Sequence, residues 1–168
     1  MEFTQGVRFD SLGLSPEIMR AIAHRNLEVS TPVQAGCIPP MMAWQDVIAK
    51  APTGTGKTFA YGIPIVEHID PEDETVQAVI LAPTRELAIQ ITGELRDIAA
   101  FKPGVRSVCL YGGQPIGKQI DTLKKRPQIV VATPGRLSDH MKRRTVKVDT
   151  VQTVVLDEAD RMLDMGFI

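Results

Sequence analysis

The apolar residues of this chain gather in five short runs, and longer segments of mixed polarity separate them. The runs span residues 46–49, 76–82, 105–110, 129–132 and 151–156. Each run is too short and too rich in β-branched residues for a helix, so each one predicts a strand. Between the runs, apolar residues recur at helical spacing, most clearly at Leu87, Ile91, Leu95 and Ile98, and again at Ile116, Ile120 and Leu123.

This alternation of strands and helices predicts an α/β fold. Continuous apolar strands separated by amphipathic helices are typical of a mainly parallel sheet that helices cover on both faces. Right-handed crossovers place the carboxyl end of every strand on one edge, where such sheets bind ligands. The segments that follow the five runs span residues 51–58, 83–85, 111–113, 133–136 and 157–160.

Composition and length bound the class of protein. With 168 residues and 43% hydrophobic content, we expect a single domain spanning residues 1–168. No apolar run approaches the roughly eighteen residues of a membrane span, and the first five residues do not resemble a signal peptide, so we expect no membrane partner and a cytoplasmic location. Cys37 and Cys109 have no metal-binding spacing, so both are interpreted as core residues.

The net charge of −1 conceals an uneven distribution. Residues 1–100 carry 7 basic and 13 acidic groups, whereas residues 101–168 carry 12 basic and 7 acidic groups. Much of the acid lies in residues 67–74, which we expect to form a solvated loop. Much of the base lies in residues 124–126 and 142–144, and such runs are more often solvated faces than direct nucleic-acid contacts.

Residues 51–58, Ala-Pro-Thr-Gly-Thr-Gly-Lys-Thr, follow a predicted strand and open a predicted helix. This context allows backbone N–H groups to surround a phosphate, and Gly54 and Gly56 permit the close approach. Lys57 would contact the β and γ phosphates, and the Thr58 hydroxyl would bind Mg²⁺. The alternative is an ordinary glycine-rich turn, which would not require the Lys-Thr pair.

Asp157 and Glu158 end the last apolar run and can complete such a site. Mg²⁺ needs further oxygen ligands besides one hydroxyl and the phosphates, and Asp157 can supply one. Glu158 can act on the attacking water as a general base or positioning group. The alternative interpretation is a helix N-terminus at which the dipole favours carboxylates.

Together these motifs resemble the DEAD-box RNA helicases over residues 9–167. The resemblance implies a RecA-like P-loop NTPase fold, a three-layer sandwich, with residues 1–168 as a C-terminally truncated first RecA-like domain and residues 9–34 as its Q-motif region. The motifs that carry it are Phe9, residues 31–34, 51–58, 83–88, 112–113, 133–136 and 157–167.

The resemblance also assigns a nucleotide site. It implies that Gln34 contacts the adenine edge and that Phe9 stacks on the base, which makes ATP the nucleotide; taken alone, these residues suggest a surface glutamine and a hydrophobic staple. The implied nucleotide-binding residues are Phe9, Gln34, Thr53, Gly54, Thr55, Gly56, Lys57 and Thr58. Lys57, Asp157 and Glu158 are implied to be catalytic, Thr58 and Asp157 to bind Mg²⁺, and Asp160 to couple hydrolysis to RNA.

RNA is the partner that the resemblance implies. Turn backbone and arginines would contact the sugar-phosphate chain without reading the sequence. The implied RNA-binding residues are Pro83, Thr84, Arg85, Gly112, Gly113, Thr133, Pro134, Gly135 and Arg136. The alternatives are a helix-capping Thr84 with a surface Arg85, and an ordinary turn at Pro134-Gly135.

Two parts of the family pattern do not occur in these 168 residues: a strand ending in Ser-Ala-Thr, and a second RecA-like domain with arginine fingers. The resemblance places that strand between those of residues 46–49 and 151–156, so we expect the gap to be filled by strand exchange with another copy in an oligomer, or by other residues. We also expect this chain to bind ATP but to hydrolyse it feebly.

The sequence departs from the family pattern at Asn26, where glycine is usual, at Leu27, where an aromatic residue is usual, and at Pro52, where glutamine is common. The alternative function is a nucleotide- or RNA-binding adaptor that does not hydrolyse ATP. A DNA helicase or another P-loop NTPase is disfavoured by Gln34 together with residues 157–160.

Overall fold

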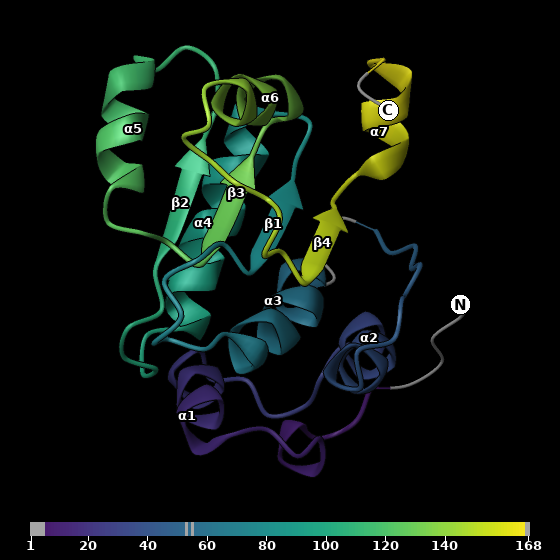
Figure 1. Cartoon of the computed structure of the whole chain (residues 1–168). Helices are drawn as coiled ribbons and strands as arrows, with labels where there is room; N and C mark the ends of the chain where they lie inside the picture. Colours follow the sequence, from purple (N-terminus) through teal and green to yellow (C-terminus); the bar gives the residue numbers. More distant parts are fainter. Residues whose placement is uncertain (1–5, 53, 55, 167–168) are drawn as a thin grey trace. The chain divides into compact units, whose positions relative to one another are not determined.

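The computed structural model describes residues 6–52, 54 and 56–166 (Figure 1). The chain divides into two compact units. The first comprises the residues up to Ile69 together with Glu94–Pro103, and the second comprises Asp70–Gly93 and the residues from Gly104 onward. The expectation of one domain over residues 1–168 stays a prediction. Within the described residues, no helix is both long and apolar enough to cross a membrane.

The first unit is helical. Its elements are η1 (Phe9–Ser11), α1 (Pro16–His24), α2 (Pro32–Met42) and α3 (Lys57–His68). The Ser15 side chain caps α1, and a capping box between Thr31 and Gln34 begins α2. Helix α2 packs against α3, where Val33, Cys37 and Ala60 form a small core.

Helix α3 lies in the core of this unit, because every residue from Thr58 to Val66 is buried. Its last turn is closed by Lys102, whose Nζ donates to the carbonyl oxygens of Val66 at 2.7 Å and Ile69 at 2.8 Å. This ammonium binds carbonyl oxygens of the last turn and the C-cap, where the regular backbone partners of the helix run out. Helix α3, which begins at Lys57, is therefore fixed at its carboxyl end by Lys102.

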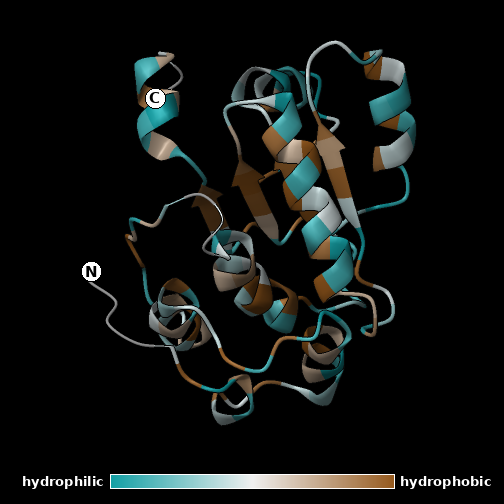
Figure 2. Cartoon of the chain, turned by 180° about the vertical axis from the view of Figure 1, so that it is seen from behind, coloured by the Kyte–Doolittle hydropathy of each residue, from teal (hydrophilic) through white to brown (hydrophobic). Residues whose placement is uncertain are grey.

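The second unit contains a four-stranded parallel sheet in the order β2-β3-β1-β4. Figure 2 shows that these strands are hydrophobic. The strands are β1 (Ala78–Leu81), β2 (Ser107–Leu110), β3 (Ile129–Ala132) and β4 (Thr153–Leu156). The helices that follow them are α4 (Arg85–Ile98), which continues into the first unit, α5 (Ile116–Leu123), α6 (Pro134–Lys142) and α7 (Ala159–Asp164).

Four of the five predicted strands are confirmed, each within its apolar run. The fifth prediction is wrong, because residues 46–49 form no strand and Ile48 is 85% exposed. A strand needs a neighbour for its backbone N–H and C=O groups, and no described strand pairs with residues 46–49. The apolar run indicated the composition of a strand but not the presence of a partner.

Strand β4 is an edge of the described sheet, since it pairs only with β1. Val154 is 62% exposed and Leu156 is 44% exposed. Both side chains alternate with half-buried Thr153 and Val155. The expectation that another strand fills the position beside β4 stays a prediction.

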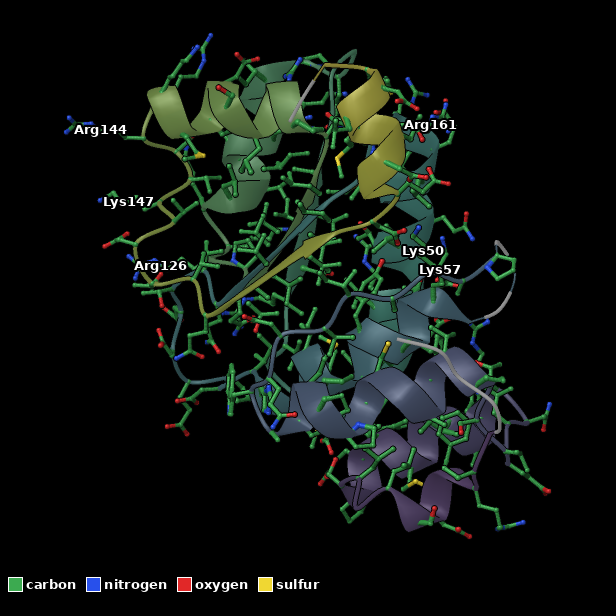
Figure 3. The ribbon with its side chains drawn as sticks, turned by 90° about the vertical axis from the view of Figure 1, so that its right-hand side faces the viewer. Lys50, Lys57, Arg126, Arg144, Lys147 and Arg161 are labelled. Atoms are coloured by element: carbon green, nitrogen blue, oxygen red, sulfur yellow. The ribbon has the colours of Figure 1, made fainter. Side chains whose placement is uncertain are left out.

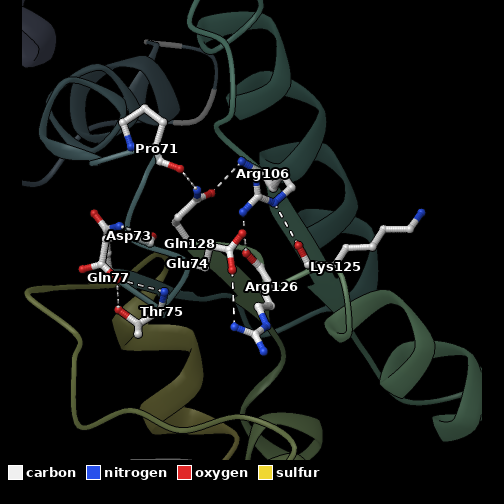
Figure 4. A network of polar contacts seen from close by, with 9 residues as sticks. All are labelled: Pro71, Asp73, Glu74, Thr75, Gln77, Arg106, Lys125, Arg126 and Gln128. Carbon is white, nitrogen blue, oxygen red and sulfur yellow. Dashed lines mark hydrogen bonds and ion pairs between the residues drawn. The ribbon is translucent and has the colours of Figure 1, made fainter.

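Two buried glutamines hold the amino-terminal edge of the sheet together (Figure 4). The Gln128 amide accepts from the Arg106 N–H at 2.7 Å and donates to the Gly104 carbonyl at 2.9 Å. Gln77 donates to the Asp73 carbonyl at 2.9 Å, which ties down the start of β1. The solvated loop predicted for residues 67–74 is only partly confirmed, because Glu67 and His68 end α3 and Ile69 is 4% exposed, whereas Glu72 to Glu74 are exposed.

Candidate functional site

The described part of the phosphate loop leads directly into α3. Gly56 is the N-cap of this helix with a φ of 78°, and Gly54 has a φ of 84°. A Cβ at Gly56 would collide with the Gln34 side-chain nitrogen, whereas a Cβ at Gly54 would meet nothing within 4 Å. Gly56 is therefore required by both its backbone conformation and its surroundings. Thr53 and Thr55, which complete the predicted loop, lie outside the described residues.

Lys57 and Thr58 are the first two residues of α3. Lys57 is half-buried, and Thr58 is 9% exposed. Among the residues that the structure describes, no side chain caps this helix N-terminus. An uncapped N-terminus that begins with a lysine and a threonine suits an anion, because the helix dipole and the first N–H groups favour negative charge. Pro52 is exposed and precedes this turn.

The Gln34 side chain connects the start of α2 to the phosphate loop. Its Oε1 accepts from the Thr31 N–H at 2.9 Å, and its Nε2 donates to the Gly56 carbonyl at 3.2 Å. The residue is only 4% exposed, so its interpretation in isolation as a surface glutamine is wrong. The amide keeps one N–H and one lone pair beyond these contacts, which is the pair of groups that an adenine edge would need.

Stacking on a base requires an exposed ring face, and Phe9 does not present one. It is 1% exposed, and its backbone N–H donates to the Glu28 carbonyl at 3.0 Å. Its ring belongs to the core and has no open face. The nearby departure at Asn26 has a structural reason, because this residue follows the C-cap of α1 with a φ of 57°, a conformation that asparagine tolerates better than most residues other than glycine.

Asp157 and Glu158 follow β4 in the second unit. Asp157 is 7% exposed, and its backbone N–H donates to the Leu81 carbonyl at 3.0 Å, which holds it against the end of β1. Glu158 has a φ of 53°, and its carboxylate lies 3.7 Å from Arg161. A left-handed glutamate is strained, and such strain is concentrated at functional sites. Asp160, the predicted coupling residue, is exposed in the first turn of α7.

The segments after β1 and β2 meet at the carboxyl edge of the sheet. The Arg85 guanidinium lies over the Tyr111 ring, 5.3 Å from its centroid, and borders Gly113. This cation-π contact orients an exposed arginine beside the exposed Gly112-Gly113 turn. The Thr84 hydroxyl accepts from the Leu87 N–H at 3.2 Å, so its helix-capping interpretation is confirmed. Pro83 is buried before this cap.

The segment after β3 joins the same edge through Arg136. The Arg136 Nη1 donates to the Gln114 carbonyl at 3.2 Å, and its side chain is only 15% exposed. Much of this arginine is therefore committed to holding the loop after β2. Thr133 is the N-cap of α6, and Pro134 and Gly135 lie in the first turn of this helix. The alternative of an ordinary Pro-Gly turn is therefore wrong.

Two residues that the sequence analysis did not select connect these loops. Gln119 is 1% exposed and donates to the Tyr111 carbonyl at 2.8 Å, while its Oε1 lies 2.7 Å from the His140 Nε2. The His140 Nδ1 lies 2.8 Å from the Thr145 hydroxyl. Burial lowers the pKa of His140, and the positive charge of Arg136 lowers that pKa further. The sequence did hold a signal for the burial of Gln119, because this residue lies on the apolar face of the predicted helix with Ile116 and Ile120.

Comparisons with known proteins show the family to which the chain belongs. A family model described as DEAD/DEAH box helicase matches residues 31–168. The chain is 54% identical over 162 residues to a protein of Bacillus licheniformis named DEAD-box ATP-dependent RNA helicase CshA, covering 96% of this chain and 33% of that protein. It is also 54% identical over 160 residues to the Geobacillus kaustophilus protein of the same name, covering 95% of this chain and 34% of the relative.

A solved structure is similar as well. The crystal structure of a DEAD box protein from the hyperthermophile Methanococcus jannaschii superimposes with a TM-score of 0.91 and 39% sequence identity, covering 98% of this chain and 45% of that protein. The α/β, RecA-like fold is therefore confirmed. The chain spans about a third of the length of the curated relatives that it matches.

Proposed function

Because the chain belongs to the DEAD/DEAH box helicase family, we propose that it is the ATP- and RNA-binding part of an ATP-dependent RNA helicase, which couples ATP hydrolysis to RNA unwinding or to remodelling of RNA-protein complexes. The observation that carries the proposal lies at the carboxyl edge of the sheet. There, Arg85 lies over Tyr111 and borders Gly113, and Arg136 donates to the Gln114 carbonyl of the same loop.

ATP would bind at the start of α3. Lys57 would contact the terminal phosphates, and the turn through Gly54 and Gly56 would surround them with backbone N–H groups. Gln34 would use its remaining amide N–H and lone pair on adenine while it stays bonded to Thr31 and Gly56. Gln34 would therefore connect the bound adenine, through Gly56, to the loop that holds the phosphates.

Mg²⁺ would accompany the nucleotide. The donor set fits this ion, because a threonine hydroxyl and one carboxylate leave room for the phosphate oxygens and waters that Mg²⁺ usually keeps. We assign the hydroxyl to Thr58 and the carboxylate to Asp157, and the ion would neutralise phosphate charge. Among the described residues, no group of three or more histidine, cysteine or acidic side chains could hold a metal by itself. Glu158 would orient the attacking water.

RNA would lie across the loops at the carboxyl edge. Arg85 would contact phosphates directly, whereas the mostly buried Arg136 would chiefly hold the loop after β2 in position. Backbone groups of the glycine turns would contribute contacts that do not depend on base identity. The proposal therefore predicts RNA binding without sequence preference.

Efficient turnover would require a second RecA-like domain as a partner. Arginine fingers contribute about 10³ to 10⁵ in rate in related phosphoryl-transfer systems, so the 168-residue chain alone would bind ATP and hydrolyse it feebly. Strand exchange at β4 and a cytoplasmic location, where RNA substrates are found, are further parts of this proposal.

A titration with a fluorescent ATP analogue tests the nucleotide site. Lys57→Ala and Gln34→Ala should each raise the dissociation constant at least about tenfold, which corresponds to about 1.4 kcal/mol. Lys118→Ala, which removes an exposed lysine elsewhere, should leave binding unchanged. Circular dichroism would establish that the Gln34 variant is folded. If neither substitution at the site weakens binding, the assignment of the site fails.

A further inference from the structure

A segment rich in cations follows α6 and plays no part in the proposed site. We call residues 142–147 the basic segment. Lys142, Arg143, Arg144 and Lys147 are all exposed, and none of them has an ion pair with another described residue. The segment contains no acidic residue. It therefore presents four uncompensated positive charges within six positions.

The backbone of the basic segment is fixed to the second unit. Val146 is 3% exposed and belongs to the main core cluster of the sheet. Thr145 donates its N–H to the His140 carbonyl at 3.0 Å, and its hydroxyl lies against the His140 ring. Figure 3 shows Arg144 and Lys147, on either side of this anchor, projecting to the same side of the molecule. The cations are thus held on an ordered support, which reduces the entropy cost of binding.

Cations at the end of a helix have a simple structural explanation that must be considered first. Helix α6 ends at Lys142, and Arg143 is its C-cap, so both side chains stabilise the helix dipole. This effect fades beyond the last turn, so it does not account for Lys147. It also does not account for an arginine at position 144, where the φ of 59° favours glycine.

A second helix end in this unit shows the same feature. Helix α5 is followed by Lys124, Lys125 and Arg126, and Arg126 has a φ of 54°. In Figure 3, Arg126 projects to the same side as Arg144 and Lys147. Arg126 already has a partner, Glu74, at 3.3 Å. Of the two arginines in strained backbone, Arg144 is therefore the one with its charge available.

We propose that the basic segment is a second contact surface for the sugar-phosphate backbone of RNA. It begins at the far end of α6 from Pro134, about 12 Å along the helix axis, so it would bind nucleotides that extend beyond the carboxyl edge of the sheet. Arginine pairs with phosphate through two N–H groups, and lysine adds a point charge. Among the described residues that flank it in the sequence, the exposed large apolar side chains are Met141 and Val148, which favours a phosphate chain over a protein partner.

Fluorescence anisotropy with two labelled single-stranded RNAs tests this inference, which rests on the proposed RNA function. One RNA of about 6 nucleotides would occupy the carboxyl edge alone, and one of about 20 nucleotides would reach both surfaces. The double variant Arg144→Gln/Lys147→Gln should weaken binding of the long RNA about tenfold and lower the slope of log K against log salt by about 1.4. Binding of the short RNA should not change.

Two further variants separate a loss of contact from a loss of folding. Arg20→Gln/Arg96→Gln removes the same charge from exposed positions of the first unit and should leave both RNAs unaffected. Arg144→Gly should raise the melting temperature, because glycine relieves the left-handed strain, yet it should still weaken binding of the long RNA.

The outcomes distinguish the two proposals. If both RNAs bind and the variants of the basic segment affect the long RNA no more than the control variant does, the second surface does not exist, while the proposed function stands. If neither RNA binds the unaltered chain, both proposals fail.

Discussion

Gly54 and Gly56 have the same left-handed backbone, but only Gly56 is crowded by neighbouring atoms. The two glycines therefore separate the effect of backbone strain from the effect of steric crowding. Gly54→Ala should cost about 1 kcal/mol of the free energy of unfolding through backbone strain. Gly56→Ala should cost more, because the new Cβ would also displace the Gln34 amide from the Gly56 carbonyl. The Gly56 variant should also bind ATP more weakly.

Urea denaturation followed by the fluorescence of Trp44, the chain's single tryptophan, would measure this difference in the first unit. The ring of Trp44 stacks on His68 with centroids 3.8 Å apart, so its emission reports on folded packing. Equal midpoints for the two alanine variants would contradict the role assigned to the contact between Gln34 and Gly56.

At the residue scale, the roles proposed for the site residues stay predictions, whereas the surroundings of several of these residues differ from what the sequence suggested. The roles proposed for lysine and threonine in the predicted phosphate loop rest on side-chain chemistry, and those of the glycines rest on backbone freedom. Gln34 and Phe9 differ, because burial and bonding partners depend on how α2 and η1 pack. No local pattern indicated that Gln34 bonds to Gly56, which lies 22 positions away.

At the scale of elements, strands were predictable where they had neighbours. The runs that contain β1 to β4 and the run at residues 46–49 are all mainly apolar, but only the first four pair with other described strands. Hydrophobic pattern reports burial and period, whereas a strand also requires a partner for its hydrogen bonds. That partner is a property of the whole sheet and leaves no signal in the run itself.

The buried contact between α5 and α6 makes a prediction about pH. Burial and the positive charge of Arg136 lower the pKa of His140 in the folded state, so the folded ring resists protonation more than the unfolded one does. Below about pH 6.5 the unfolded state binds a proton that the folded state resists, so stability should fall as the pH drops from 6.5 towards the lowered pKa of the folded state. His140→Gln should remove this part of the pH dependence.

Urea midpoints followed by circular dichroism between pH 8 and pH 5, for the unaltered chain and for His140→Gln, would measure this effect. His24→Gln removes an exposed histidine and serves as the control. Asp139 opposes the shift, whereas Arg143 adds to it. The assignment fails if His140→Gln and the unaltered chain lose stability in parallel as the solution is acidified.

At the scale of the whole molecule, the exposed edge of the sheet predicts self-association. Within the described part of the chain, strand β4 pairs only with β1, and its exposed Val154 and Leu156 make the other edge a template for a further strand. Val154→Lys should raise the dissociation constant for self-association about tenfold, because an edge lysine resists strand pairing. Ile89→Lys, at an exposed apolar position on α4, should not raise it.

Sedimentation velocity over a range of protein concentrations would compare the two variants with the unaltered chain. The expected mechanism is pairing along β4, so any association should decrease with Val154→Lys while the circular dichroism spectrum of the monomer stays unchanged. A chain that stays monomeric at all concentrations would show that the β4 edge needs no second copy. Association that persists unchanged in Val154→Lys would place the contact on another surface.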